Sequence, residues 1–103
     1  MSKFLVVFTT APTEREARII ARKLIEEDLA KCVSIAPIRS FFKWKGEMND
    51  VSEYLLIVKA TLKNYKKLEE KIKELHSYEV PELVGFPIVK GSKEYLKWLE
   101  GSG

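Results

Sequence analysis

The residues best suited to chemistry lie in one short segment, from Leu75 to Glu82. The segment holds the single histidine of the chain, His76, followed by Tyr78 and Glu79. Histidine titrates near neutral pH and is a frequent metal ligand, and carboxylates also bind metal ions. One histidine cannot build a multi-histidine site within one chain. His76 therefore either has a modest local role, such as capping the helix before it, or contributes to a site shared between copies of the chain.

A second group of candidate residues lies near a predicted hairpin tip. The run from Arg39 to Gly46 contains three aromatic residues and three cations, and Phe42 and Trp44 share one face because alternate strand residues do. Aromatic and arginine side chains anchor interfaces, so this run predicts a contact surface. The alternative is a twisted edge strand whose large side chains pack on their own hairpin. Lys59, at the end of an apolar strand, either binds an anion or extends to solvent.

Several classes of function are disfavoured by what the sequence lacks. It has no CxxC pair, no HExxH, no Gly-rich phosphate loop and no nucleophile elbow. We therefore expect a protein that is not an enzyme and requires no cofactor. An RNA-recognition domain needs a basic-Gly-aromatic signature in its third strand, and the run from Ser52 to Lys59 lacks it. We expect no nucleic-acid partner.

Composition indicates one compact domain over residues 1–103. The formal net charge of +3 comes from interleaved basic and acidic residues, without the basic stripe that follows a phosphate backbone. No apolar run reaches the roughly 20 residues of a membrane helix, and the first strand follows Met1 without a hydrophobic leader. The single cysteine, Cys32, suits a reducing cytoplasm. The absence of glutamine, with abundant Lys and Glu, favours a thermostable protein.

Hydrophobic periodicity and turn residues predict the elements. Thr13 and Glu16 form a capping-box pattern at the start of the first helix, and Ser92 caps the last one. The predicted strands cover residues 3–10, 32–45 (interrupted at Pro37), 51–61 and 83–89, with a turn at 46–50. The predicted helices run from Thr13 to near Leu29, from about Tyr65 to Leu75, and from 92 to 99.

This order, β-α-β-β-α-β with a short final helix, predicts an α+β ferredoxin-like fold with one antiparallel sheet and two helices on one face. The second and fourth strands of this topology are edges, where Pro37 and Pro87 are tolerated. Both central strands are apolar on both faces, although two helices cover only one. Soluble monomers seldom expose apolar patches beyond about 300–600 Å². The pattern therefore predicts self-association.

Several blocks, in order and spacing, resemble the CutA family of divalent-cation tolerance proteins along nearly the whole chain. The blocks are Thr10-Ala11-Pro12, Leu29-Ala30-Lys31-Cys32-Val33-Ser34, Ser40-Phe41-Phe42-Lys43-Trp44-Lys45-Gly46, Leu75-His76-Ser77-Tyr78-Glu79-Val80-Pro81-Glu82-Leu83 and Tyr95-Leu96-Lys97-Trp98-Leu99. The resemblance implies a ferredoxin-like homotrimer in which hairpins pair across subunits. It also implies a role in tolerance of copper and other divalent metals.

The resemblance also suggests which residues bind ligand. Some family members are proposed to bind copper at three positions that correspond here to Thr9, Leu75 and His76, so this chain keeps only the histidine. Imidazole suits copper and the other two side chains do not, so we expect weak metal binding at His76 and Glu79. The residues expected to line an inter-subunit cleft are Trp44, Lys59, Tyr78, Glu82, Tyr95 and Trp98. The alternative is a PII-like trimeric anion sensor or assembly scaffold that uses Lys59 and binds no metal.

Overall fold

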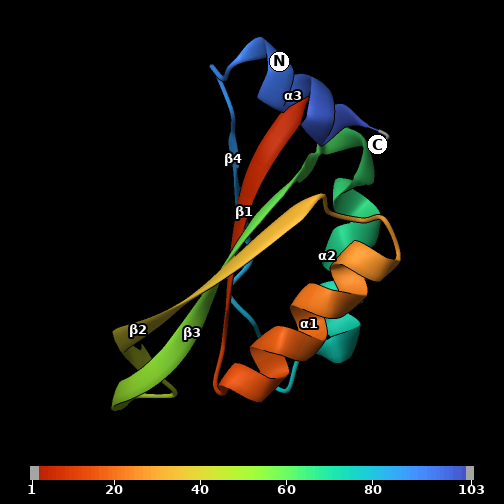
Figure 1. Ribbon diagram of the computed structural model, residues 1–103. Helices are drawn as coiled ribbons and strands as arrows, with labels where there is room; N and C mark the ends of the chain where they lie inside the picture. The colour runs from red at the N-terminus through yellow and green to blue at the C-terminus, as the bar shows by residue number, and fades with distance from the viewer. Residues whose placement is uncertain (1–2, 102–103) are drawn as a thin grey trace.

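The computed structural model describes residues 3–101, so residues 1, 2, 102 and 103 of the predicted domain lie outside the described part. The elements are β1 (Phe4–Ala11), α1 (Glu14–Glu26), β2 (Cys32–Trp44), β3 (Glu47–Thr61), the short 3-10 helix η1 (Leu62–Asn64), α2 (Tyr65–Leu75), β4 (Val84–Pro87) and α3 (Lys93–Glu100). The predicted order is confirmed. Figure 1 shows α1 and α2 together on one face of the sheet, while α3 lies at the end where β1 begins.

The sheet has the strand order β2-β3-β1-β4, and every pairing is antiparallel. The second and fourth strands are therefore edges, as predicted, and they carry Pro37 and Pro87. The predicted interruption at Pro37 is wrong, because this residue pairs with Tyr54 inside a continuous β2. An edge strand needs a backbone donor on one side only, so it accommodates the missing proline N–H without a break.

The β2–β3 hairpin is longer and its turn is tighter than predicted. The turn consists of Lys45 and Gly46, with φ angles of 51° and 81°, and Trp44 pairs directly with Glu47. The predicted turn over residues 46–50 is therefore wrong, since β3 begins at Glu47. Two central residues with positive φ make a two-residue turn whose twist matches the strands, so pairing continues up to it. The hairpin projects beyond the helices in Figure 1.

Two other boundaries differ from the prediction. α1 ends at Glu26 rather than near Leu29, because Asp28 adopts a left-handed conformation with φ of 57° and closes the helix. β4 covers four residues rather than the predicted 83–89. Beyond Pro87 one further backbone bond, from the Ile88 N–H to the Phe4 carbonyl at 2.9 Å, keeps the chain beside β1.

The core lies between the helices and one face of the sheet. Alternate residues of the two central strands pack against apolar stripes of α1 and α2. The fully buried core residues are Val7, Leu56 and Val58 from the strands, and Ala17, Ile20, Leu24, Leu68 and Ile72 from the helices. Strand alternation and the i, i+3, i+4 helical spacing place these residues on facing surfaces. The sheet and helices are thereby fixed to one another.

The opposite face of the sheet, here called the open face, is also apolar. It carries Val6, Phe8, Leu55, Ile57, Val84 and Phe86, whose shared orientation follows from the strand pairing. The Phe8 and Phe86 rings meet edge to face with centroids 5.3 Å apart, yet Phe86 is still 48% exposed. α3 covers only one end of this face, where Leu99 is buried. The predicted apolar character of both faces is confirmed. No helix within residues 3–101 is long and apolar enough to span a membrane.

Candidate ligand groove beside a buried histidine

His76 directly follows α2 as its C-cap residue, and its ring is completely buried. Its Nε2 lies 2.5 Å from the carbonyl oxygen of Thr10, and its Nδ1 is 3.0 Å from the backbone nitrogen of Tyr78. A carbonyl accepts and a backbone N–H donates, so the arrangement assigns the proton to Nε2 and leaves Nδ1 as the acceptor. Both ring nitrogens therefore have protein partners. The ring joins the end of β1 to the segment after α2 rather than bonding the carbonyls of its own helix.

Glu16 connects this segment to α1. Thr13 caps α1 as predicted, since its Oγ1 accepts the Glu16 N–H at 3.1 Å. The Glu16 carboxylate does not complete a capping box. Its Oε2 instead accepts from the backbone N–H and the hydroxyl of Ser77, each at 3.0 Å, and lies 3.4 Å from His76 Nδ1. Three segments of the chain are thus held around one imidazole.

Tyr78 turns from this network toward the open face. Its hydroxyl donates to Glu53 Oε2 at 2.7 Å, and Glu53 is only 4% exposed. The pKa of Tyr78 is raised to about 12. Burial of the hydroxyl is the larger cause, and its hydrogen bond to the Glu53 carboxylate is the second. Sequence alone indicates that Glu53 cannot pair with Lys59, about 20 Å away along the same strand. It does not reveal that a tyrosine 25 residues later supplies the partner.

A groove of about 330 Å³, here called the hairpin groove, lies between the β2–β3 hairpin and the segment after His76. It is lined by Phe42, Trp44, Asn49, Val51, Tyr78, Glu79 and Val80. Two residues predicted to line a ligand cleft, Trp44 and Tyr78, meet here with Glu79, a predicted metal contact. The Lys45 ammonium lies 5.6 Å from the centre of the Trp44 ring and 3.9 Å from the Glu79 carboxylate. Aromatic walls with a few charged groups at the rim suit a small polar ligand.

Sequence reasoning missed Asn49, Val51 and Val80 as lining residues. The register of the hairpin explains two of them, because Asn49 pairs with Phe42 and Val51 pairs with Ser40. Directly paired residues of antiparallel strands point to the same side. A correct prediction of the two-residue turn would therefore have placed both on the groove side.

The other predicted contacts lie elsewhere in the chain. The Lys59 ammonium is 5.5 Å from the centre of the Tyr95 ring, and the Tyr95 and Trp98 rings are 5.6 Å apart. We call these three residues the α3 cluster, and Lys31 lies 5.2 Å above the Trp98 ring beside it. Glu82 is exposed and does not line the groove. Within one chain, the six predicted ligand residues therefore do not form one site.

No group of three or more His, Cys, Asp or Glu residues with the geometry to hold a metal ion occurs within residues 3–101. Glu79 has a side chain that is 75% exposed and accessible to a cation. A metal ion would reach His76 only by displacing Thr10 or Tyr78 from the ring, because both nitrogens are engaged. Metal contact by His76 and Glu79 stays a prediction.

Comparison with known proteins gives the family. The family model described as CutA1 divalent ion tolerance protein matches residues 5–102. The chain belongs to this family. The divalent-cation tolerance protein CutA of Thermus thermophilus is 50% identical over 95 residues, which cover 91% of this chain and 92% of the relative. The resemblance found in the sequence is thereby confirmed.

Solved structures of CutA1 relatives share the fold. The structure described as a periplasmic divalent cation tolerance protein CutA from Archaeoglobus fulgidus superimposes with a TM-score of 0.92 at 38% identity, covering 94% of this chain and 95% of that one. CutA1 from the psychrotrophic bacterium Shewanella sp. SIB1, described as a stable protein, gives 0.93 at 33% identity, with 96% and 94% covered. The predicted α+β architecture is confirmed by these matches.

Proposed function

We propose that this CutA1-family chain, over residues 1–103, acts in divalent-cation tolerance as a non-enzymatic homotrimer that holds its ligand in grooves between subunits. The observation that carries the proposal is the position of the hairpin groove. Its aromatic wall, formed by Phe42, Trp44 and Tyr78, lies beside an open apolar face that a single chain covers only at one end. A partner that covers this face also closes the groove.

The two separate groups of predicted ligand residues support the shared site. The hairpin groove and the α3 cluster lie toward opposite ends of the sheet, with the β2–β3 turn at one end and α3 at the other. If the groove of one copy meets the α3 cluster of the next, Trp44 and Tyr78 come to face Lys59 and Tyr95. This contact is head to tail, and such contacts close into rings when the rotation permits. Three copies then form three equivalent clefts.

We expect the metal ion to bind weakly, with the Glu79 carboxylate as its first ligand. Its exposed carboxylate at the groove rim is available to a copper or another divalent ion once it separates from Lys45, whose 3.9 Å pairing is loose. Exposed ion pairs of this kind contribute little, about 0–1 kcal/mol. His76 joins as a ligand only if its ring releases one of its partners, and otherwise it positions Tyr78. A reducing cytoplasm, consistent with the unpaired Cys32, is the compartment we propose.

Calorimetric titration with copper and zinc tests this assignment. Glu79→Gln is expected to weaken binding by about fivefold or more, because a neutral amide replaces the carboxylate. His76→Gln is expected to change the heats only if the ring releases a partner for the metal. Glu70→Gln, which removes the same charge from an exposed position on α2, is the matched control. Equal heats for wild type, Glu79→Gln and His76→Gln would remove both residues from the metal site.

A further inference from the structure

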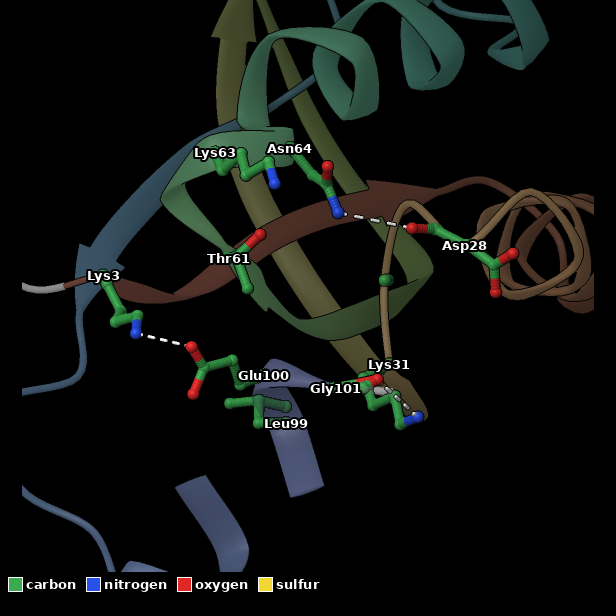
Figure 2. Close-up of a pocket in the computed structure, with 10 residues that line it drawn as sticks. Lys3, Asp28, Lys31, Thr61, Lys63, Asn64, Leu99, Glu100 and Gly101 are labelled. Carbon is green, nitrogen blue, oxygen red and sulfur yellow. Dashed lines mark hydrogen bonds and ion pairs between the residues drawn. The ribbon is translucent and has the colours of Figure 1, made fainter. Parts of the chain in front are cut away.

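A second cavity, here called the end cavity, lies at the end of the molecule opposite the hairpin turn. Its volume is about 610 Å³. The lining comes from the start of β1, the loop between α1 and β2, the end of β3 with η1, and the end of α3: Lys3, Asp28, Ala30, Lys31, Thr61, Lys63, Asn64, Leu99, Glu100 and Gly101. Figure 2 shows these side chains arranged around a common space.

The end cavity has an excess of positive charge. Three lysines, at positions 3, 31 and 63, face two carboxylates, Asp28 and Glu100, which leaves a net charge of +1. Lys3 is paired with Glu100 at 2.6 Å, and the Lys31 ammonium lies 3.5 Å from the carbonyl oxygen of Gly101. Lys63 makes no ion pair with any carboxylate of residues 3–101. Within the described residues, no carboxylate therefore offsets the charge of Lys63.

The walls of the cavity are tied to one another before any ligand binds. The Asn64 side-chain amide donates to the carbonyl oxygen of Asp28 at 3.3 Å, which joins η1 to the loop after α1. The backbone N–H of Lys31 donates to the carbonyl oxygen of Lys59 at 3.0 Å. The Lys3–Glu100 pair joins the two ends of the described chain across the cavity (Figure 2). These ties hold the segments that carry the lysines in place, and a wall that is already fixed lowers the entropic cost of binding.

We propose that the end cavity binds a small dianion of the phosphate class. In this site Lys63 contacts the anion directly, and Lys3 leaves its ion pair with Glu100 to contact the anion as well. A tetrahedral dianion carries oxygens in several directions and can accept from ammonium groups that come from different segments. Thr61 adds a hydroxyl donor on the same wall. The carboxylate of Glu100 is a competitor, since it already neutralises Lys3. This site is independent of the hairpin groove, because the two share no lining residue.

Titration with inorganic phosphate and pyrophosphate, at constant ionic strength and without divalent metal, tests the proposal. Lys63→Gln is expected to weaken binding about tenfold, the effect of losing one charge-assisted hydrogen bond. Lys43→Gln removes the same charge from an exposed site near the hairpin turn and is expected to bind like wild type.

Glu100→Gln gives a prediction of opposite sign. The substitution removes the competing carboxylate and frees Lys3, so phosphate is expected to bind several-fold more tightly. Weaker binding by Glu100→Gln, equal binding by wild type and Lys63→Gln, or a response that chloride reproduces would each overturn the proposal. None of these results bears on the metal titration of Glu79, so the two assignments fail separately.

Discussion

The buried ring of His76 connects the end of β1 with the segment after α2, through bonds to the Thr10 carbonyl and the Tyr78 N–H. Substitution by alanine leaves both of these backbone groups without a partner inside the protein. An unsatisfied buried donor or acceptor costs about 1–3 kcal/mol. We therefore expect His76→Ala to lower the free energy of unfolding by about 3 kcal/mol or more in guanidinium titrations.

The control for this prediction is Lys73→Ala, on the exposed surface of the same helix. Lys73 pairs with Glu69 at 3.3 Å, and its side chain is largely exposed. Exposed helical pairs contribute about 0.3–0.5 kcal/mol. Equal losses of unfolding free energy in His76→Ala and Lys73→Ala would show that the imidazole has no structural role. The ring would then be available to bind a metal ion.

Tyr78 makes stability depend on pH in the alkaline range. Its pKa is raised to about 12 in the folded chain from an ordinary value of 10. The folded state thus holds this proton more tightly, so the contribution is complete below pH 10 and is lost as the pH rises from 10 to 12. Because the ring is only partly buried, we expect the loss to be about 1–2 kcal/mol.

Tyr78→Phe tests this pH dependence. At pH 7 the variant is expected to be less stable by about 1–2 kcal/mol, since the buried Glu53 carboxylate loses its donor. The difference from wild type should shrink between pH 10 and 12 in urea titrations. Other alkaline titrations, including that of Tyr65, occur in both proteins and cancel in the difference. A constant difference across this range would contradict the raised pKa.

At the residue scale, the sequence indicates which side chains are chemically unusual but not what they contact. His76 and Tyr78 stand out by type, whereas Thr10 contributes only a backbone carbonyl, 66 residues away. Glu53 is recognisable as a charge in an apolar strand, but its partner depends on how the segment after α2 turns. Such contacts follow from the packing of segments that are distant in the chain, and no local pattern records them.

At the element scale, the turn between β2 and β3 offers a paired prediction. Lys45 and Gly46 both have positive φ, and a Cβ on Gly46 would meet no atom within 4 Å. An alanine at this position would therefore cause no steric clash, and its only cost is backbone strain. A left-handed conformation costs an L-residue about 1–2 kcal/mol. Gly46→Ala should lower the free energy of unfolding by about 1 kcal/mol, and Lys45→Gly should raise it slightly, in thermal unfolding. Two losses of similar size would contradict this account.

Helix starts were predictable because they depend on local chemistry. The side chains of Thr13 and Ser92 cap α1 and α3 by accepting the N–H three residues later, as their patterns predict. Strand ends were less predictable. Three of the four residues from Glu47 to Asp50 are polar and the run resembles a turn in sequence, yet it pairs in register with the end of β2. Long cross-strand pairing overrode the local preference there.

At the scale of the whole molecule, the order of strands and the two apolar faces could be read from the chain. β-strand alternation reveals two apolar sides, and the split β-α-β topology assigns helices to one of them. The cavity at the end of the sheet could not be read in this way. Its lysines come from segments near residues 3, 31 and 63, which meet only after the sheet and α3 are in place.

The open face also predicts the effect of one substitution on assembly. Ile57 lies in the middle of β3 on this face, and a glutamate there would bury an unpaired charge in any subunit contact. We expect Ile57→Glu to weaken association by more than about a hundredfold while the chain stays folded. Ile19→Glu, the same change at an exposed position on α1, should leave association unchanged. Circular dichroism with size-exclusion chromatography separates loss of assembly from loss of fold.

Sedimentation equilibrium at micromolar concentration measures the assembly directly. We expect a particle of three chains, each of 11.9 kDa, with no folded single chain present. A folded particle with the mass of one 11.9-kDa chain would contradict it, because the hairpin groove and the α3 cluster would then never face each other.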